Sequence, residues 1–171
     1  MLKKYLIPDV FYDNIYQITP EYLLGEGVKA LVLDIDNTLV TYDDPEPTES
    51  VLEWLRSMEE AGISIAFVSN NKPPRVERFN SKLGYFARAK GGKPFTKNIK
   101  RAMVHMGVTR NETALIGDQL LTDILAARSA KLRRAFLVKP IKDKTDAFTR
   151  SKRMLEKPFI KKYYKMQDGE K

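Results

Sequence analysis

Apolar residues along the chain gather into five short runs that have the length of β-strands. The first covers residues 28–33 and is apolar enough to be buried on both faces. The others cover residues 63–68, 85–87, 113–116 and 135–138. Between these runs, apolar positions recur every three or four residues, as on one face of a helix. The alternation predicts an α/β fold with three layers, a doubly wound parallel sheet with helices on both faces.

Local signals predict where the helices begin. Thr48 is a suitable N-cap for the helix after the first strand, because its side-chain oxygen can accept a bond from a free backbone amide. Pro73 and Pro94 each favour a helix start. Phe95 is expected on the buried face of the helix that Pro94 opens, and a further helix is expected over 122–129.

The chain divides into a core and two flanking segments of one domain. Residues 28–138 hold the strand and helix pattern of the core, and residues 1–27 form an N-terminal arm expected to pack on its outside. Residues 139–171 carry 11 Lys/Arg against 5 Asp/Glu, so most of the formal net charge of +8 lies there. Apolar residues at helical spacing in this tail, among them Phe148, predict a helix that Pro158 interrupts.

Composition limits the kinds of site that the chain can build. The chain has no cysteine and one histidine, which excludes disulfides, zinc–thiolate sites, iron–sulfur clusters and a multi-histidine site within one chain. Any metal must therefore be held mainly by oxygen. The charge of +8 favours acidic partners such as phosphorylated compounds, nucleic acid or anionic lipid.

Hydropathy predicts a cytoplasmic protein. No run reaches the roughly 18 apolar residues of a transmembrane helix, and the first residues lack the hydrophobic region of a signal peptide. A peripheral position at a membrane surface stays open. Neither pattern nor charge specifies an oligomeric state.

Polar residues follow the predicted strands at the points where ligands bind to open parallel sheets. The first strand ends in Asp34-Ile35-Asp36-Asn37-Thr38, the second in Ser69-Asn70-Asn71, and the fourth in a segment that contains Asp118 and Asp123. Lys93 precedes the helix after the third strand. Clustered carboxylates can hold a hard cation, while a hydroxyl and a lysine can bind phosphate oxygens. Together these residues predict a magnesium-dependent phosphoryl-transfer site.

These segments resemble the four motifs of the haloacid dehalogenase-like (HAD) phosphatases. The run 34–38 is similar to the first motif, Asp-x-Asp-x-Thr, and Ser69, Lys93 and the pair Asp118 and Asp123 follow in the family's order. The resemblance covers about residues 28–138 and is closest to subfamily IIIA, the YqeG-type proteins. Related members of that group act as phosphatidylglycerophosphate phosphatases. The resemblance implies a HAD-like Rossmannoid core and a Mg²⁺-dependent phosphomonoester hydrolase.

Four residues are expected to carry out the chemistry. Asp34 is the expected nucleophile, and its attack on phosphorus would form an aspartyl-phosphate that divides one difficult displacement into two. Asp36 would protonate the leaving alkoxide and then deprotonate the attacking water. Ser69 and Lys93 would hold the non-bridging phosphate oxygens, and Lys93 would also offset the repulsion between Asp34 and the phosphate.

Four aspartates are expected to surround the metal ion. Asp34 and Asp118 would bind Mg²⁺ through their carboxylates. Asp36 would face the ion with its backbone carbonyl, and Asp123 would act through a water molecule or as an outer acceptor. Three further residues are candidates for binding the phosphate or the rest of the substrate: Thr38, Asn70 and Asn71.

The spacing of the motifs predicts a capless site. Only 31 positions separate Thr38 from Ser69 and 24 separate Ser69 from Lys93, and each gap is largely filled by one helix and one strand. A site that is open to solvent suits a large or surface-bound substrate better than a small metabolite. The resemblance and the open site together make phosphatidylglycerophosphate at an anionic membrane surface one candidate, with the basic tail as the membrane contact.

Two other interpretations remain open. A phosphatase of nucleic-acid ends or of phosphoproteins would use the same basic charge and open site, although no base-stacking aromatic platform or known nucleic-acid motif is evident. A non-catalytic HAD-fold protein that binds RNA or regulates a partner is the third interpretation. The presence of both Asp34 and Asp36 argues against it.

Overall fold

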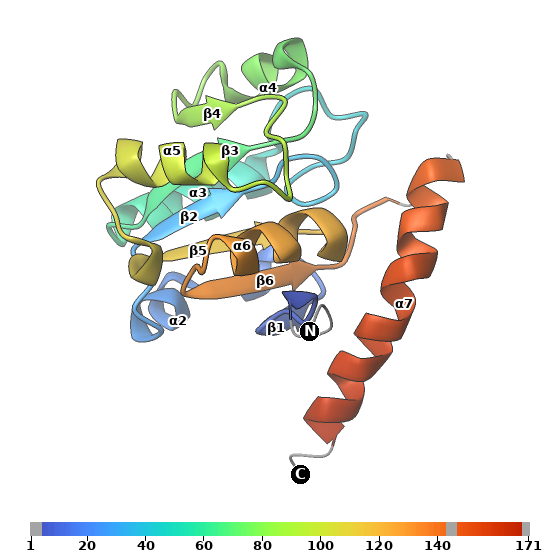
Figure 1. The fold of residues 1–171 in the computed structure, drawn as a ribbon. Helices are drawn as coiled ribbons and strands as arrows, with labels where there is room; N and C mark the ends of the chain where they lie inside the picture. The colour runs from blue at the N-terminus through green and yellow to red at the C-terminus, as the bar shows by residue number, and fades with distance from the viewer. Residues whose placement is uncertain (1–4, 143–146, 169–171) are drawn as a thin grey trace.

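The chain folds into a sheet of six parallel strands (Figure 1). A computed structural model describes residues 5–142 and 147–168, and the side chain of Phe148 lies outside the described residues. The strands are β1 (Val10–Tyr12), β2 (Ala30–Leu33), β3 (Ser64–Val68), β4 (Phe86–Arg88), β5 (Thr113–Gly117) and β6 (Arg134–Val138), in the sheet order β1-β6-β5-β2-β3-β4. The predicted parallel sheet is confirmed.

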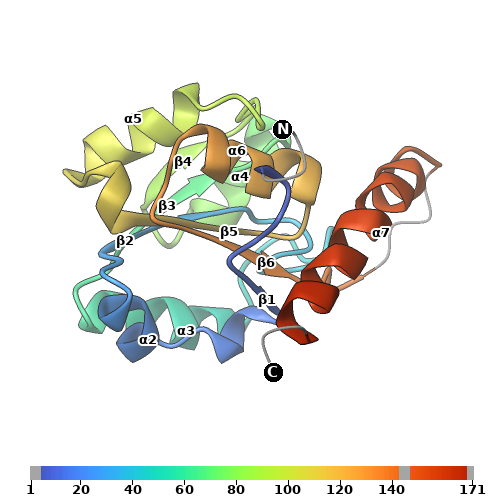
Figure 2. The same cartoon turned by 60° about the horizontal axis from the view of Figure 1, so that its bottom comes forward.

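Helices cover both faces of the sheet, as the alternating pattern predicts. Figure 2 shows α2 and α3 on one face and α5 and α6 on the other. One apolar cluster, which includes Trp54 and Phe67, fills the space under α3, and a second, which includes Ile99 and Leu115, lies under α5 and α6. The helices are α2 (Pro20–Gly25), α3 (Glu49–Glu60), α4 (Pro73–Asn80), α5 (Lys97–Met106), α6 (Leu125–Ser129) and α7 (Ala147–Asp168), with short turns η1 (Ile15–Gln17), η2 (Arg110–Glu112) and the π-helical η3 (Leu120–Ile124).

The helix starts agree with the sequence signals at two places and differ at one. Thr48 caps α3 by accepting a bond from the amide of Val51, and α4 begins at Pro73. The helix expected at Pro94 begins instead at Lys97, and Phe95 is 77% exposed rather than buried. The amide of Phe95 bonds the carbonyl of Gly92, so residues 92–95 form a turn ahead of the helix.

The N-terminal arm is part of the sheet as well as of the surface. Its strand β1 pairs in parallel with β6, which adds a sixth strand to the five that the sequence predicts. Ile15 and Leu23 are buried in the core under α3 rather than on the outside. The arm therefore completes one edge of the sheet.

The basic tail forms one helix, α7, and Pro158 does not interrupt it. The proline removes one backbone hydrogen bond, but contacts on both sides of it hold the helix to the core. The carboxylate of Glu156 accepts a bond of 3.1 Å from the amide of Leu121, and the hydroxyl of Tyr163 accepts one of 3.1 Å from the amide of Phe11. Among the described residues, no helix is long and apolar enough to cross a membrane.

No cap domain is inserted between the motifs. Within the fully described stretch from Thr38 to Lys93, the chain forms α3, β3, α4 and β4 with short connections. The capless arrangement predicted from the spacing is confirmed.

Candidate active site

The predicted site residues converge at one edge of the sheet. Asp34, Asp36 and Thr38 follow β2; Ser69, Asn70 and Asn71 follow β3; Lys93 precedes α5; and Asp118 and Asp123 follow β5. In parallel strands the carboxyl ends lie at one edge, so residues far apart in the sequence become neighbours. In Figure 1 this is the edge toward which the arrowhead of β6 points.

A buried cluster of three carboxylates and one ammonium forms the centre of this edge. Carboxylate oxygens of Asp34, Asp118 and Asp123 lie within 4.8 Å of one another. The Nζ of Lys93 lies 2.8 Å from Oδ1 of Asp34 and 2.7 Å from Oδ1 of Asp123. The side chain of Lys93 is only 2% exposed, so these ion pairs are shielded from water.

Hydrogen bonds among the segments after β3, β4 and β5 fix this cluster. Asp123 lies in η3, and its Oδ2 accepts a bond of 3.1 Å from the amide of Gln119. The side chain of Asn70 bonds both backbone groups of Lys93, at 2.9 Å to its amide and 3.0 Å to its carbonyl. In this structure Asn70 therefore holds the backbone that carries the lysine, and its predicted contact with phosphate remains a prediction.

Asp36 lies beside the cluster with a separate set of partners. Its Oδ1 accepts a bond of 2.9 Å from Nε of Arg75, and its Oδ2 accepts one of 2.9 Å from the side-chain amide of Asn71. The backbone amide of Asn71 donates a bond of 3.2 Å to the hydroxyl oxygen of Ser69. The Asp36 carboxylate is not one of the three carboxylates that could hold a metal ion together. Its expected contact with the metal would therefore be through its backbone carbonyl.

Burial and nearby charges act in opposite directions on the pKa values of Asp34 and Lys93. Burial raises the pKa of Asp34 to about 6, although the ammonium of Lys93 acts in the other direction. Burial alone would lower the pKa of Lys93, but the carboxylates of Asp123 and Asp34 outweigh burial and raise it. At pH 7 the lysine is therefore a cation and Asp34 is mostly ionised.

The donor set fits a hard divalent cation. The site brings four carboxylates together with two cations, Lys93 and Arg75, so two negative charges are left when all groups are ionised. Three of the carboxylates are buried and offer oxygen ligands, which divalent ions such as Mg²⁺ prefer. A bound divalent ion would balance the charge.

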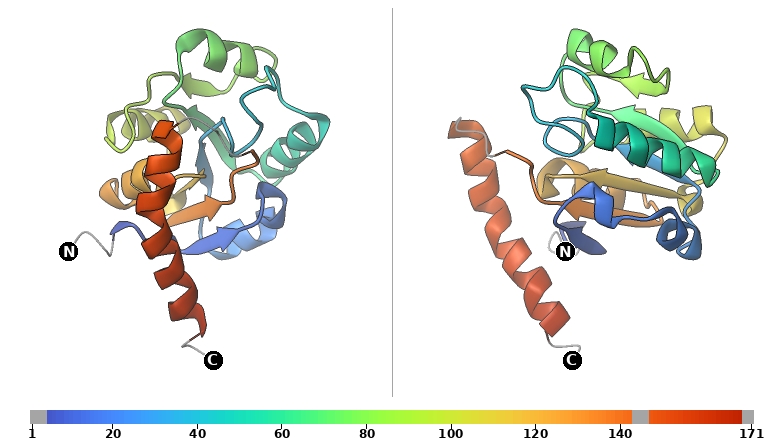
Figure 3. Two further views of the ribbon diagram at one scale, coloured as in Figure 1. Left: turned by 90° about the vertical axis from the view of Figure 1, so that its right-hand side faces the viewer. Right: turned by 180° about the vertical axis from the view of Figure 1, so that it is seen from behind.

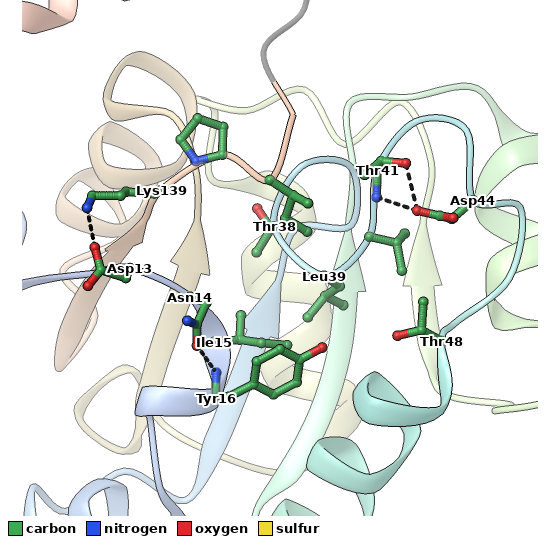
Figure 4. Close-up of a pocket in the computed structure, with 13 residues that line it drawn as sticks. Asp13, Asn14, Ile15, Tyr16, Thr38, Leu39, Thr41, Asp44, Thr48 and Lys139 are labelled. Carbon is green, nitrogen blue, oxygen red and sulfur yellow. Dashed lines mark hydrogen bonds and ion pairs between the residues drawn. The ribbon is translucent and has the colours of Figure 1, made fainter.

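A pocket of about 470 Å³ borders the first motif (Figure 4). Thr38 and the residues after β1 and β6 line it. Its charged groups are held by polar partners: Lys139 contacts Asp13, and Asp44 accepts bonds of 3.0 and 2.6 Å from the amide and hydroxyl of Thr41. These pairs order the loops around the site.

Within the described residues, the Asp36 carboxylate contacts two side chains, those of Asn71 and Arg75. The sequence analysis predicted Asn71 as a site residue but did not predict Arg75. It lies on α4, two positions after the proline that opens the helix, and no motif spacing distinguishes it from the other basic residues there. Its contact with Asp36 spans 39 positions of sequence, so only the fold brings the two together.

Comparisons with known proteins agree with this geometry. The sequence model of the family described as haloacid dehalogenase-like hydrolase matches residues 12–137. A protein of Bacillus subtilis (strain 168) named "Probable phosphatase YqeG" is 40% identical over 160 residues, which cover 94% of this chain and 92% of that protein.

Solved structures show the same fold at low identity. The cobalt-bound deoxy-D-mannose-octulosonate 8-phosphate phosphatase of Haemophilus influenzae superposes with a TM-score of 0.54 and 21% identity over 66% of this chain and 69% of that one. A HAD-superfamily hydrolase of Ehrlichia chaffeensis superposes with a TM-score of 0.51 and 16% identity. The match covers 66% of this chain and 87% of that one. The fold, the match to the family's sequence model and the similarity to the Bacillus protein together establish that this chain belongs to the haloacid dehalogenase-like hydrolase family and is a phosphatase.

Proposed function

We propose that this phosphatase hydrolyses phosphomonoesters with Mg²⁺ through an aspartyl-phosphate on Asp34. The observation that carries the proposal is the buried Asp34 carboxylate, held by Lys93 and grouped with Asp118 and Asp123. Lys93 offers a positive charge where an incoming phosphate would meet Asp34. Without that charge, two anions would have to approach each other in a site shielded from water.

In the first half-reaction, an oxygen of Asp34 forms a bond to phosphorus and the bond from phosphorus to the substrate oxygen breaks. Asp36, in its protonated form, gives its proton to the departing alkoxide, so that an alcohol leaves. Ser69 and Lys93 hold the non-bridging oxygens. The products of this step are the free alcohol and phospho-Asp34.

In the second half-reaction, the Asp36 carboxylate takes a proton from water as the water oxygen attacks phosphorus. The bond between phosphorus and Asp34 breaks, which releases inorganic phosphate and restores the carboxylate. Asp36 is protonated again and ready for the next substrate. One side chain thus serves as acid and then as base.

Asp34, Asp118 and Asp123 would hold the Mg²⁺ ion through carboxylate oxygens, the last either directly or through water. When bound, the ion supplies positive charge that offsets the charge of the phosphate. The test is hydrolysis of p-nitrophenyl phosphate by the purified protein with Mg²⁺ and with excess chelator. Loss of turnover in chelator is expected, and equal rates would contradict the proposal.

We propose phosphatidylglycerophosphate at an anionic membrane surface as the substrate, for a cytoplasmic protein that binds the membrane peripherally. The site has no cap, so a headgroup that is still attached to a bilayer could reach it. Helix α7 lies beside the edge of the sheet that carries the site, as Figures 1 and 3 show. Similarity to the YqeG-type group also supports this substrate.

The described part of α7 carries charge that suits an anionic surface. Four of its lysines are exposed: Lys157, Lys161, Lys162 and Lys165. The one acidic residue between positions 151 and 167, Glu156, is buried against η3. Met154 and Leu155 are 67% and 64% exposed, so the helix also presents apolar groups. Attraction of about 1 kcal/mol per well-placed lysine favours binding to anionic lipid.

A panel of substrates tests this choice. Phosphatidylglycerophosphate in vesicles, a short alkyl phosphate, a 5′-phosphorylated oligonucleotide and a phosphopeptide are assayed side by side with Mg²⁺. The highest kcat/KM is expected for the lipid. A preference for the oligonucleotide or the peptide would transfer the function to nucleic-acid ends or phosphoproteins, and no turnover of any substrate would favour a non-catalytic role.

A further inference from the structure

Arg75 contacts Asp36 in a way that none of the roles above uses. Its Nε and Nη2 each lie 2.9 Å from Oδ1 of Asp36. The same guanidinium donates to the carbonyl of Thr41 at 3.2 Å and to the carbonyl of Pro45 at 3.0 Å. The side chain of Arg75 is 15% exposed and that of Asp36 6%, so water screens the contact only weakly.

The loop that Arg75 holds is the one that follows Asp36 in the chain. Asp36 pairs with Val40 in an isolated parallel bridge, and the loop then turns through residues 41–45. Figure 4 shows its internal bonds, in which Asp44 accepts from the amide and the hydroxyl of Thr41. One guanidinium thus joins α4, the Asp36 carboxylate and both ends of this loop.

The orientation of Asp36 depends on these donors. Arg75 fixes Oδ1, and the side-chain amide of Asn71 fixes Oδ2 at 2.9 Å. A group that transfers a proton must be held close to the required geometry, and small displacements are costly in rate. Lysine cannot reproduce the planar fork of arginine, so the charge alone would not replace the contact.

We infer that Arg75 is a positioning residue, which holds Asp36 and the loop 41–45 in the arrangement needed for proton transfer to the leaving oxygen. The inference rests on the acid–base role proposed for Asp36. Arg75 acts through Asp36, since its hydrogen bonds within the described residues are with that carboxylate and with backbone carbonyls.

The experiment compares Arg75→Gln and Arg75→Lys with Arg78→Gln, a matched change at an exposed arginine on the same helix. Two substrates are used: an alkyl phosphate, whose alkoxide needs a proton to leave, and p-nitrophenyl phosphate, whose leaving group does not. For Arg75→Gln, kcat on the alkyl phosphate should fall about 100-fold, the scale of one acid–base contribution, while kcat on p-nitrophenyl phosphate falls several-fold. Arg75→Lys should lie between wild type and Arg75→Gln, and Arg78→Gln should match wild type.

A double-mutant cycle with Asp36→Asn separates the possible failures. If Arg75 acts through Asp36, adding Arg75→Gln to Asp36→Asn causes little further loss on the alkyl phosphate. Equal losses on both substrates, or losses that multiply in the double variant, would overturn the inference while the role of Asp36 stands. If Asp36→Asn alone fails to distinguish the substrates, the proposed acid role and the inference that rests on it both fail. Should Arg75→Gln not fold, as thermal unfolding would reveal, the Arg75→Lys comparison decides by the same criterion.

Discussion

Gly117 leaves the space that the side chain of Asp123 occupies. A Cβ at position 117 would lie 2.3 Å from Cγ and 2.6 Å from Oδ2 of Asp123, closer than real Cβ atoms approach. Asp123 in turn contacts Lys93, which contacts Asp34. The absence of a side chain at the end of β5 therefore sets the position of the proposed nucleophile's partners.

Gly117→Ala should displace Asp123 and impair the site. We expect a loss of stability of about 1–3 kcal/mol from overpacking, and a fall in kcat of about 100-fold, the scale of a 1 Å misplacement. Gly25→Ala is the control, because nothing lies within 4 Å of the added Cβ on α2. Thermal unfolding and turnover of p-nitrophenyl phosphate measure both effects, and an unchanged Gly117→Ala would show that Asp123 can move without consequence.

Asp34→Asn should remove activity without unfolding the protein. Asparagine has nearly the same size and keeps an oxygen that can accept a bond from Lys93, but it cannot attack phosphorus as a carboxylate does. Turnover should fall by several orders of magnitude, with an unchanged circular dichroism spectrum. Near-normal turnover would exclude Asp34 as the nucleophile.

Mg²⁺ binding should weaken at acid pH. Burial raises the pKa of Asp34 to about 6, so the proton competes with the ion below that pH and leaves the carboxylate above it. The apparent affinity should fall up to about tenfold per pH unit below 6 and change little above about 7. Titration calorimetry at several pH values measures this, and an affinity that stays constant from pH 7 to 5 would show that Asp34 does not bind the ion.

Replacing the exposed lysines of α7 by Gln should reduce vesicle binding and spare the chemistry. The variant carries changes at Lys157, Lys161, Lys162 and Lys165. Sedimentation with anionic liposomes at low salt should show most of the binding lost, because the Coulomb attraction of about 1 kcal/mol per lysine is removed. Turnover of p-nitrophenyl phosphate should stay near wild type.

A control of equal charge change uses four exposed lysines outside α7: Lys29, Lys82, Lys100 and Lys131. This variant should still bind vesicles. Equal loss in both variants would indicate an effect of net charge alone, and loss of soluble-substrate turnover in the α7 variant would indicate that the helix supports the fold.

The sequence was informative about the site because chemistry follows the strand ends. Asp34, Lys93 and Asp118 are each polar residues at the end of an apolar run or just before a helix, and a parallel sheet brings such positions to one edge. Strand order was not needed for that prediction.

Features that depend on long-range contacts could not be predicted in this way. Strand β1 has only three residues, and its pairing with β6 joins segments more than 120 positions apart. Helix α7 continues through Pro158 because Glu156 and Tyr163 are held by the core, which local propensity does not report. Arg75 is recognised as a site residue only through its contact with Asp36 in the folded chain.

Trapping of the phosphorylated enzyme tests the central claim most directly. Asp36→Asn is mixed with Mg²⁺ and p-nitrophenyl phosphate, whose leaving group needs no proton from Asp36. The mixture is quenched in acid within one turnover, digested and examined by mass spectrometry. The predicted result is one phosphoryl group on the peptide that contains Asp34, removed by hydroxylamine and absent when Asp34→Asn is added. Turnover with no phosphorylated peptide, or with the phosphoryl group on another residue, would contradict the account.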